Sequence, residues 1–549
     1  MSSRALVVLL AGAVGLIGCG DGHDSGAQRI AFVTGSVDVV PRPADVKVDR
    51  DGSVFVFDDQ TAVVVARDEP TARGAADLLV ALLRGPFPGH PDSAEAPRGP
   101  PRRDAVLLTL SGAAALGRDG YELEVTPHHV LVRAAAPAGL VHGVQTLRQL
   151  LPPEIEQRAP VPGVVWSVPS VQIRDVPRFG WRGLLIDTSR TFFPKEFLLR
   201  QLELMALYKL SVLHLHLTDD QGWRLEIESH PELHELGSQW DAQRAPNERS
   251  GYYTKADIRE IVDRATALGI EVLPEIDMPG HIVAALHALP ELACRTAPDQ
   301  PRSADEFPIV PATERPFPKN ILCVCDERVY EVMQAVLDEV IALFPNAFVH
   351  VGGDEVVRRD EWEQGYLCRD LIERGVVEST DHLQGYFQKR IEDFLRSRGR
   401  RMIAWDEALV HEQPDTPSEQ LSSWASFMFW RDFLRPPARL YERDVVAAPF
   451  TRLYLDYKTA IDRVYEFDPV PEGLTREQAA HVLGAEGAMW TGAPDARSEQ
   501  GAERHMFPRV LAIAELTWTP RALRDGNDFA RRLGRETGRL EMLGIPLGP

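Results

Sequence analysis

The feature that most constrains this chain is a regular alternation of buried-strand and helix patterns from Trp181 onward. The strand candidates are 181–188 (WRGLLIDT), 212–219 (VLHLHLTD), 270–277 (IEVLPEID), 348–355 (FVHVGGDE), 401–407 (RMIAWDE), 421–426 (LSSWAS), 444–449 (DVVAAP) and 482–490 (VLGAEGAMW). Eight such strands are the number that closes a parallel β/α barrel. We therefore predict a TIM (β/α)8 barrel over residues 173–549.

Helix patterns lie between these strands. Thr254 is a good N-cap with Asp257 three residues on, apolar residues then recur at helical spacing, and Gly269 ends the segment. We predict two further helices over about 327–344 and 382–397, each directly before a strand candidate.

Polar and aromatic residues end nearly every strand candidate. They are Asp187, Asp219, Asp277, Asp354, Glu355, Trp405, Asp406, Trp424 and Trp490. In a β/α barrel the carboxyl ends of the strands meet at one face, where the active site is built. The pattern thus predicts a single mouth lined with carboxylates and indole rings.

The region before the barrel reads as a separate small α/β domain, 30–172. It contains short strand candidates at 62–66, 105–110, 121–125 and 130–134, and helical stretches at 72–83 and 140–151. A Pro-rich segment over 84–103 predicts a surface loop.

The first twenty residues have the layout of a secretory leader: a basic start at Arg4, then an apolar run that is too short to span a bilayer. The segment ends in Leu16-Ile17-Gly18-Cys19, which resembles a bacterial lipobox. We expect a signal peptide over 1–18, Cys19 as the lipidated mature N-terminus, and a tether over 19–29. The alternative is an ordinary signal peptide with Cys19 incidental. Either version predicts export from the cytoplasm. The lipidated version places the protein at the bacterial cell envelope, periplasmic or on the cell surface, and any membrane attachment is through lipid.

Charge and cysteine content narrow the partners further. The chain has 60 Lys and Arg against 81 Asp and Glu, a net charge of −21, which argues against nucleic acid as a partner. Four cysteines follow the leader, at 294, 323, 325 and 368, and an exported protein can form disulfides between them. We favour a Cys294–Cys323 bond.

Carboxylates and tryptophans at one mouth fit a carbohydrate ligand. Indole faces stack on the apolar faces of sugar rings, and carboxylates can bind hydroxyls and supply the acid for glycosidic cleavage. Within the segment 349–355 (VHVGGDE), two glycines let the backbone approach a ligand closely. The adjacent Asp354 and Glu355 can take different roles if their surroundings separate their pKa values.

These motifs together resemble glycoside hydrolase family 20, the β-N-acetylhexosaminidases. The HxGGDE motif is intact, and RGLLIDTSR, YKLSVLHLHLTDDQGWRLEI, EIDMPGH, AWDE, YLDY and GAMW occur in the family's order. The segment 120–151 is similar to the non-catalytic domain that precedes the barrel in that family. The resemblance implies an exo-acting enzyme that removes terminal β-linked N-acetylhexosamine, with retention of configuration and without a cofactor.

In this family the substrate's own 2-acetamido group is the nucleophile. The resemblance implies that Glu355 is the general acid and later the base. Asp354 would hold the acetamido N–H and stabilise the oxazolinium intermediate, and Tyr454 would donate to the acetamido oxygen.

The same resemblance implies which residues line the sugar-binding pocket. Arg190 matches an arginine that binds the sugar hydroxyls O3 and O4, and a salt bridge to a barrel acid is the alternative. Trp405, Trp424 and Trp490 match aromatic walls, Asp456 matches a hydroxyl acceptor, His281 with Asp219 matches a pair that supports the acid, and Asp277 is expected behind them. A structural histidine at a strand end is the alternative for His281.

The chain departs from the family where Trp490-Thr491-Gly492 replaces the usual Trp-x-Glu. The missing glutamate leaves open a relaxed preference between GlcNAc and GalNAc, an altered outer pocket, or replacement by Asp495. Thr191 and Ser211 also replace the family's usual histidine and asparagine.

Three other functions remain open. A disaccharide-releasing relative, similar to a lacto-N-biosidase, would use the same acids. A weakly catalytic glycan-binding lipoprotein would fit the missing glutamate, although it would not need Asp354, Glu355 and Tyr454. A metal-dependent amidohydrolase would use His214-Leu215-His216 as zinc ligands, because alternating strand residues face one way.

Overall fold

The computed structural model describes residues 37–548 except for 50, 67–68, 88–92, 96–103, 240–249, 311–319, 358, 411–419, 435 and 437–438. The leader, Cys19 and the tether lie outside the described residues, so export and lipidation stay predictions. No helix in the described part is both long and apolar enough to cross a bilayer.

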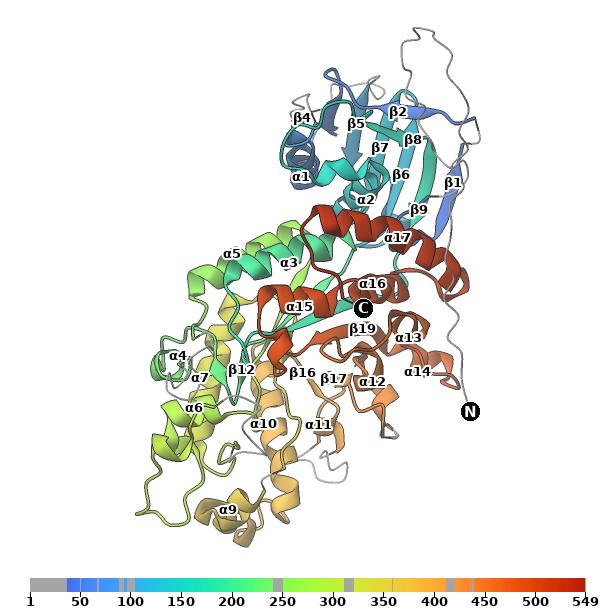
Figure 1. Ribbon diagram of the computed structural model, residues 1–549. Helices are drawn as coiled ribbons and strands as arrows, with labels where there is room; N and C mark the ends of the chain where they lie inside the picture. Colours follow the sequence, from blue (N-terminus) through green and yellow to red (C-terminus); the bar gives the residue numbers. More distant parts are fainter. Residues whose placement is uncertain are drawn as a thin grey trace, which may run out of the picture. The chain divides into compact units, whose positions relative to one another are not determined.

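The N-terminal domain is built on a seven-stranded sheet with the order β1-β9-β6-β7-β5-β3-β4 (Figure 1). Its strands are β1 (Asp45–Val48), β3 (Ala62–Val65), β4 (Ser93–Glu95), β5 (Ala105–Thr109), β6 (Tyr121–Thr126), β7 (His129–Ala134) and β9 (Val171–Asp175). A separate pair joins β2 (Val54–Val56) to β8 (Ser167–Pro169). The predicted α/β domain is confirmed, with α1 (Arg73–Arg84) and α2 (Pro137–Leu150) as its long helices.

Two sequence expectations for this domain need correction. The segment 84–103 contains the edge strand β4, which pairs in parallel with β3 and is therefore not loop throughout. The expected domain end at 172 falls inside β9, which pairs with β1 and β6 and carries the sheet to Asp175. Both strands are fixed by pairing with distant segments, which local periodicity does not reveal.

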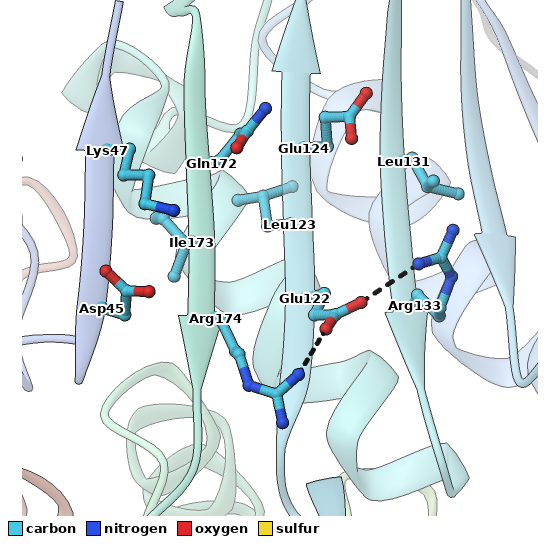
Figure 2. Close-up of a pocket in the computed structure, with 10 residues that line it drawn as sticks. All are labelled: Asp45, Lys47, Glu122, Leu123, Glu124, Leu131, Arg133, Gln172, Ile173 and Arg174. Atoms are coloured by element: carbon cyan, nitrogen blue, oxygen red, sulfur yellow. Dashed lines mark hydrogen bonds and ion pairs between the residues drawn. The ribbon is translucent and has the colours of Figure 1, made fainter. Parts of the chain in front are cut away.

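The outer face of the sheet is polar and solvated (Figure 2). Strand β6 alternates buried and half-buried residues, so Glu122 and Glu124 point outward. Glu122 accepts from Arg133 of β7 at 3.1 Å and from Arg174 of β9 at 2.9 Å. These cross-strand pairs engage Glu122, Arg133 and Arg174 on this face, and the opposite face packs on α2.

The larger, C-terminal domain is a closed barrel of eight parallel strands, which confirms the predicted fold (Figure 1). The strands are β10 (Trp181–Asp187), β11 (Val212–His216), β14 (Glu271–Glu275), β15 (Phe348–His350), β16 (Arg401–Trp405), β17 (Ser426–Phe429), β18 (Val445–Ala447) and β19 (Val482–Met489). Seven coincide with the predicted segments. The prediction for the sixth is wrong, because the strand is 426–429 (SFMF) and LSSWAS lies almost entirely before it.

Helices connect and cover the strands. They are α3 (Lys195–Leu207), α4 (Glu232–Glu235), α5 (Lys255–Ala267), α6 (Val283–Ala288), α7 (Glu327–Leu343), α8 (Asp360–Gln364), α9 (Tyr366–Glu373), α10 (Leu383–Ser397), α11 (Glu407–Val410), α12 (Phe450–Leu453), α13 (Ile461–Glu466), α14 (Arg476–Ala480), α15 (Glu499–Met506), α16 (Arg509–Trp518) and α17 (Gly526–Met542); a short hairpin pairs β12 (Thr218–Asp219) with β13 (Gly222–Trp223). Helix α5 begins as predicted, with Thr254 and Asp257 forming a reciprocal capping box.

Buried polar contacts join the N-terminal domain to the barrel. Trp518 of α16 donates its indole N–H to Asp175 of β9 at 2.9 Å, and Arg182 of β10 donates to Asp119 at 3.1 Å. Gln149 of α2 donates to the carbonyl of Leu207 in α3 at 2.9 Å. One contiguous apolar core includes side chains from both domains.

Two disulfides lie beside the loop that follows β14. Cys294 bonds Cys323, the pairing favoured from the sequence, and Cys325 bonds Cys368. Leu322 directly precedes Cys323, and its backbone N–H donates to the carbonyl of Pro279 at 2.9 Å. The disulfides therefore anchor a segment that packs on the loop carrying His281.

Helix α17 offers a test of the packing at the C-terminal end. Arg532 is buried and makes a two-pronged ion pair with buried Glu515, with both N–O distances at 2.6 Å. We expect Arg532→Ala to lower the free energy of unfolding by about 3–5 kcal/mol, because Glu515 would keep a buried, unpaired charge. Arg535→Ala, on the same helix but 38% exposed, should cost less than about 1 kcal/mol. Chemical denaturation monitored by tryptophan fluorescence measures both, and equal losses would contradict this explanation.

Candidate active site

The candidate acids follow β15 in a segment whose backbone turns sharply. Gly352 and Gly353 have φ of +63° and +92°. A Cβ at Gly352 would overlap the carboxylate of Asp277, so only glycine fits there. Glu355 itself has φ of +50°, a conformation that is unusual for a side-chain-bearing residue and typical of functional sites.

His281 connects the acid to a buried carboxylate. Its Nδ1 lies 3.2 Å from Oδ1 of Asp219, and its Nε2 lies 3.3 Å from Oε2 of Glu355 and 3.7 Å from Oδ2 of Asp354. Burial alone would lower the pKa of His281, but the negative charges of Asp219 and Asp354 hold it well above its usual value. His281 is therefore a cation that touches both candidate acids.

The two adjacent acids have different environments. Burial raises the pKa of Asp354 to about 6, with a further contribution from the charge of Glu355. The hydrogen bond from His281 lowers the pKa of Glu355, whose side chain is 45% exposed. One acid thus lies within the pocket and the other faces the solvent, as distinct roles require.

Arg190 binds two acids of the mouth. Its guanidinium lies 3.2 Å from Asp187 and 2.6 Å from Asp219, and 4.9 Å from the ring centre of Trp490. The alternative that the sequence left open for Arg190, a salt bridge to a barrel acid, is therefore present. The same contacts hold the guanidinium over the indole ring, beside the candidate sugar site.

Aromatic rings line the mouth, with one correction to the predicted set. Trp490 lies 6.0 Å from Trp405 and 5.8 Å from Tyr454, measured between ring centres. Trp424 is 57% exposed and precedes β17, so it lies at the amino end of the strand and not at the mouth. Trp430, directly after β17, stacks on Tyr454 at 6.2 Å and takes that place.

Sequence reasoning missed Trp430 because the sixth strand was placed too early. The signal that could have found it is the apolar run 427–430 (FMFW), which resembles the other buried strands more closely than LSSWAS does. The wall residue is the tryptophan that ends this run.

Glu407, after β16, was also missed as a site residue. Its carboxylate accepts from the indole N–H of Trp430 at 2.8 Å and from the backbone N–H of Glu355 at 3.5 Å. Burial and the charge of Asp354 raise its pKa to about 8. Glu407 therefore ties the aromatic wall to the backbone of the candidate acid.

Two carboxylate oxygens of the pocket have no hydrogen-bond partner among the described residues. They are Oδ1 of Asp354 and Oδ1 of Asp456, both buried. Burial raises the pKa of Asp456 to about 7. Because buried polar atoms normally have a partner, these oxygens are suited to a polar ligand.

The histidines of the His214-Leu215-His216 segment face carboxylates inside the barrel. Nδ1 of His214 lies 2.7 Å from Glu486, while Nδ1 and Nε2 of His216 lie 2.6 Å from Glu275 and 3.0 Å from Asp219. His214, Glu275 and His350 are also close enough to hold a metal ion in principle. The carboxylate contacts already give His214 and His216 a structural role, so the metal alternative is not needed to explain the motif.

Behind the acids, Asp277 is fully buried and accepts from the backbone N–H of Gly353 at 3.3 Å.

Gly492 stands where the family usually has a glutamate, and its backbone carbonyl accepts from Arg497 at 2.8 Å. Asp495 is 60% exposed and pairs with His505 at 3.3 Å. Its carboxylate is thus engaged by a helix α15 side chain.

Comparisons with known proteins agree with this geometry. Residues 179–521 match "Glycosyl hydrolase family 20, catalytic domain", and residues 36–176 match "Glycosyl hydrolase family 20, domain 2". The chain is 34% identical to a beta-hexosaminidase of Porphyromonas gingivalis over 93% of its own length, and it spans 64% of that relative. It is 31% identical to a beta-N-acetylhexosaminidase of Cellulomonas fimi, with 91% of this chain and 93% of the relative covered.

A solved structure extends the likeness to three dimensions. The exo-beta-N-acetylglucosaminidase of Vibrio harveyi, in complex with N-acetylglucosamine, aligns with a TM-score of 0.79 at 28% identity. The alignment covers 94% of this chain and 79% of that one. The similarity thus includes both domains.

Proposed function

The chain belongs to glycosyl hydrolase family 20, and from this premise we propose that it is an exo-acting β-N-acetylhexosaminidase. The observation that carries the proposal is the pair Asp354 and Glu355, held in different environments with His281 against both. Members of this family use the substrate's 2-acetamido group as the nucleophile, so no carboxylate of the enzyme needs to attack.

The first step breaks the glycosidic bond. The acetamido oxygen attacks the anomeric carbon, and Glu355 gives its proton to the departing glycosidic oxygen. The hydrogen bond from His281 keeps the pKa of Glu355 low in the open site. A substrate that covers the half-exposed carboxylate removes water from it and raises its pKa toward the value that an acid requires.

The intermediate is a positively charged oxazolinium ring. Asp354, inside the pocket, accepts from the acetamido N–H through its free Oδ1 and stabilises the charge. Tyr454 is almost fully buried between Trp430 and Trp490, where its hydroxyl donates to the acetamido oxygen. Glu355, now a carboxylate, takes a proton from water as the water opens the ring, so the product retains its configuration.

The remaining polar groups of the pocket bind the hydroxyls of the sugar. Arg190 donates to hydroxyls beside Trp490, and Asp456 accepts through its free Oδ1. Gly492 contributes no side chain where the family usually has a glutamate. We therefore expect weak discrimination between the two epimers at C4, because position 492 has no carboxylate that would bind one epimer and not the other.

The direct test is nitrophenol release from the β-GlcNAc and β-GalNAc glycosides, with and without EDTA. We expect hydrolysis of both, at rates within about tenfold of each other, and no effect of EDTA. Glu355→Gln should reduce turnover of unactivated β-N-acetylhexosaminides by at least about 10³-fold, because no proton reaches the leaving oxygen. Release from neither glycoside would contradict the proposal and favour a disaccharide-releasing enzyme or a glycan-binding protein.

Asp354 also sets a pH dependence. The carboxylate form is the active one, so kcat/KM should rise with pH through about 6, where Asp354 loses its proton. Asp354→Asn should lower kcat by about 10²- to 10³-fold and abolish this acid limb, because the amide neither titrates nor offsets positive charge. pH–rate profiles of the two proteins measure this. An unchanged kcat, or an acid limb that survives in the variant, would assign the limb to another group.

A further inference from the structure

The most exposed large apolar side chain in the described part of the chain is Trp424, at 57%. It stands two residues before β17, at the amino end of the barrel, whereas the candidate acids follow β15 at the carboxyl end. Tryptophan side chains are usually mostly buried. Neither the apolar core nor the candidate active site accounts for this indole ring.

Hydrogen bonds hold the backbone from which the indole ring projects. The backbone carbonyl of Trp424 accepts from Nε of Arg401 at 3.1 Å, and its backbone N–H donates to the hydroxyl of Ser422 at 3.2 Å. Ser422 in turn donates to the buried carboxylate of Glu392 in α10. The exposed ring is thus carried by a segment that is bonded both to strand β16 and to helix α10.

Charged residues stand beside this segment at the amino ends of neighbouring strands. Arg401, the first residue of β16, has its Nη2 2.7 Å from Oδ2 of Asp444, which directly precedes β18. Oδ1 of Asp444 lies 3.0 Å from Nδ1 of His481, which directly precedes β19. Because β16, β17, β18 and β19 are neighbours in the barrel, their amino ends bring these residues together. We name Arg401, Trp424, Asp444 and His481 the amino-end cluster.

The amino-end cluster keeps hydrogen-bonding groups free after these contacts. Among the described residues, Nη1 of Arg401, Nε2 of His481 and the indole N–H of Trp424 have no partner. Each carboxylate oxygen of Asp444 accepts one bond and retains a second lone pair. The three charged or ionisable side chains are all partly exposed, so a ligand from the solvent can reach them.

This combination of groups fits a sugar. A pyranose ring packs its C–H face on an indole ring, and its hydroxyls both donate and accept, so they can bind the free N–H groups and the Asp444 carboxylate together. A protein partner would require a continuous apolar patch, and the centres of protein interfaces are poor in charged residues. A nucleic acid would face a chain with a net charge of −21.

We propose that the amino-end cluster is a second carbohydrate-binding site, at which a sugar ring stacks on Trp424 and its hydroxyls bind the three polar side chains. That this sugar is an N-acetylhexosamine unit of a glycan chain rests on the proposed function. The cluster and the acids lie at opposite ends of the barrel, so one sugar cannot contact both. The second site therefore holds a polymeric glycan while the pocket removes a terminal residue from a neighbouring chain.

The test separates binding of a polymer from catalysis on a small substrate. Binding is measured by affinity electrophoresis in native gels that contain glycol chitin, a soluble polymer of N-acetylglucosamine units with few chain ends. Glu355→Gln is the background, so that the polymer is not degraded during the run. Adding Trp424→Ala should raise the apparent Kd for the polymer by about tenfold, because the stacking surface is lost.

Three further measurements control this result. His481→Ala, which keeps the indole ring and removes one donor, should raise the apparent Kd by about threefold. Leu236→Ala, which removes another exposed apolar side chain, 48% exposed at the end of α4, should leave it unchanged. In the protein that retains Glu355, Trp424→Ala should leave kcat/KM for the nitrophenyl β-GlcNAc glycoside unchanged.

The outcomes separate this inference from the proposed function. Unchanged retardation after Trp424→Ala would overturn the inference, and so would a Glu355→Gln protein that the polymer does not retard, or an equal loss in the Leu236→Ala control. A protein that is retarded through Trp424 but releases no nitrophenol from either glycoside would overturn the proposed function and leave the second site supported.

Discussion

A carboxylate buried at the centre of the barrel, Glu275, organises much of what surrounds the site. It accepts from His216 at 2.6 Å and from the indole N–H of Trp405 at 2.9 Å. His216 in turn contacts Asp219, which lies 3.2 Å from His281. Because a buried charge is tolerated only when it is paired, each member of this series fixes the position of the next. The orientation of the candidate acid thus depends on contacts that begin in the barrel interior.

The backbone supplies a second constraint. His281 and Glu355 both have φ of +50°, a conformation that costs about 1–3 kcal/mol per residue and persists only where the surroundings enforce it. The close packing of Gly352 on Asp277 and the disulfide-anchored segment beside Pro279 provide such surroundings. The packing around these two residues therefore stabilises the strained backbone that places His281 against Glu355.

The sequence predicted the barrel and the acids because both depend on local order: a buried strand followed at once by its functional residue. Trp430 is not predicted, because the sixth strand is expected at LSSWAS, whereas the strand is formed by the buried run that follows it. The contacts of Glu275, Glu407 and Trp430 join separate strands and loops, so no local pattern reveals them. For the same reason, the predicted domain end at 172 falls inside strand β9.

The central claim is that the substrate's acetamido group attacks the anomeric carbon while Asp354 stabilises the resulting charge. Its most direct test is the rate of hydrolysis of nitrophenyl glycosides whose N-acetyl group carries none, one, two or three fluorine atoms. Each fluorine makes the acetamido oxygen a weaker nucleophile without changing the leaving group. The account predicts that kcat/KM falls steeply with every fluorine added. Rates that do not depend on fluorination would show that the acetamido group does not attack and would contradict the account.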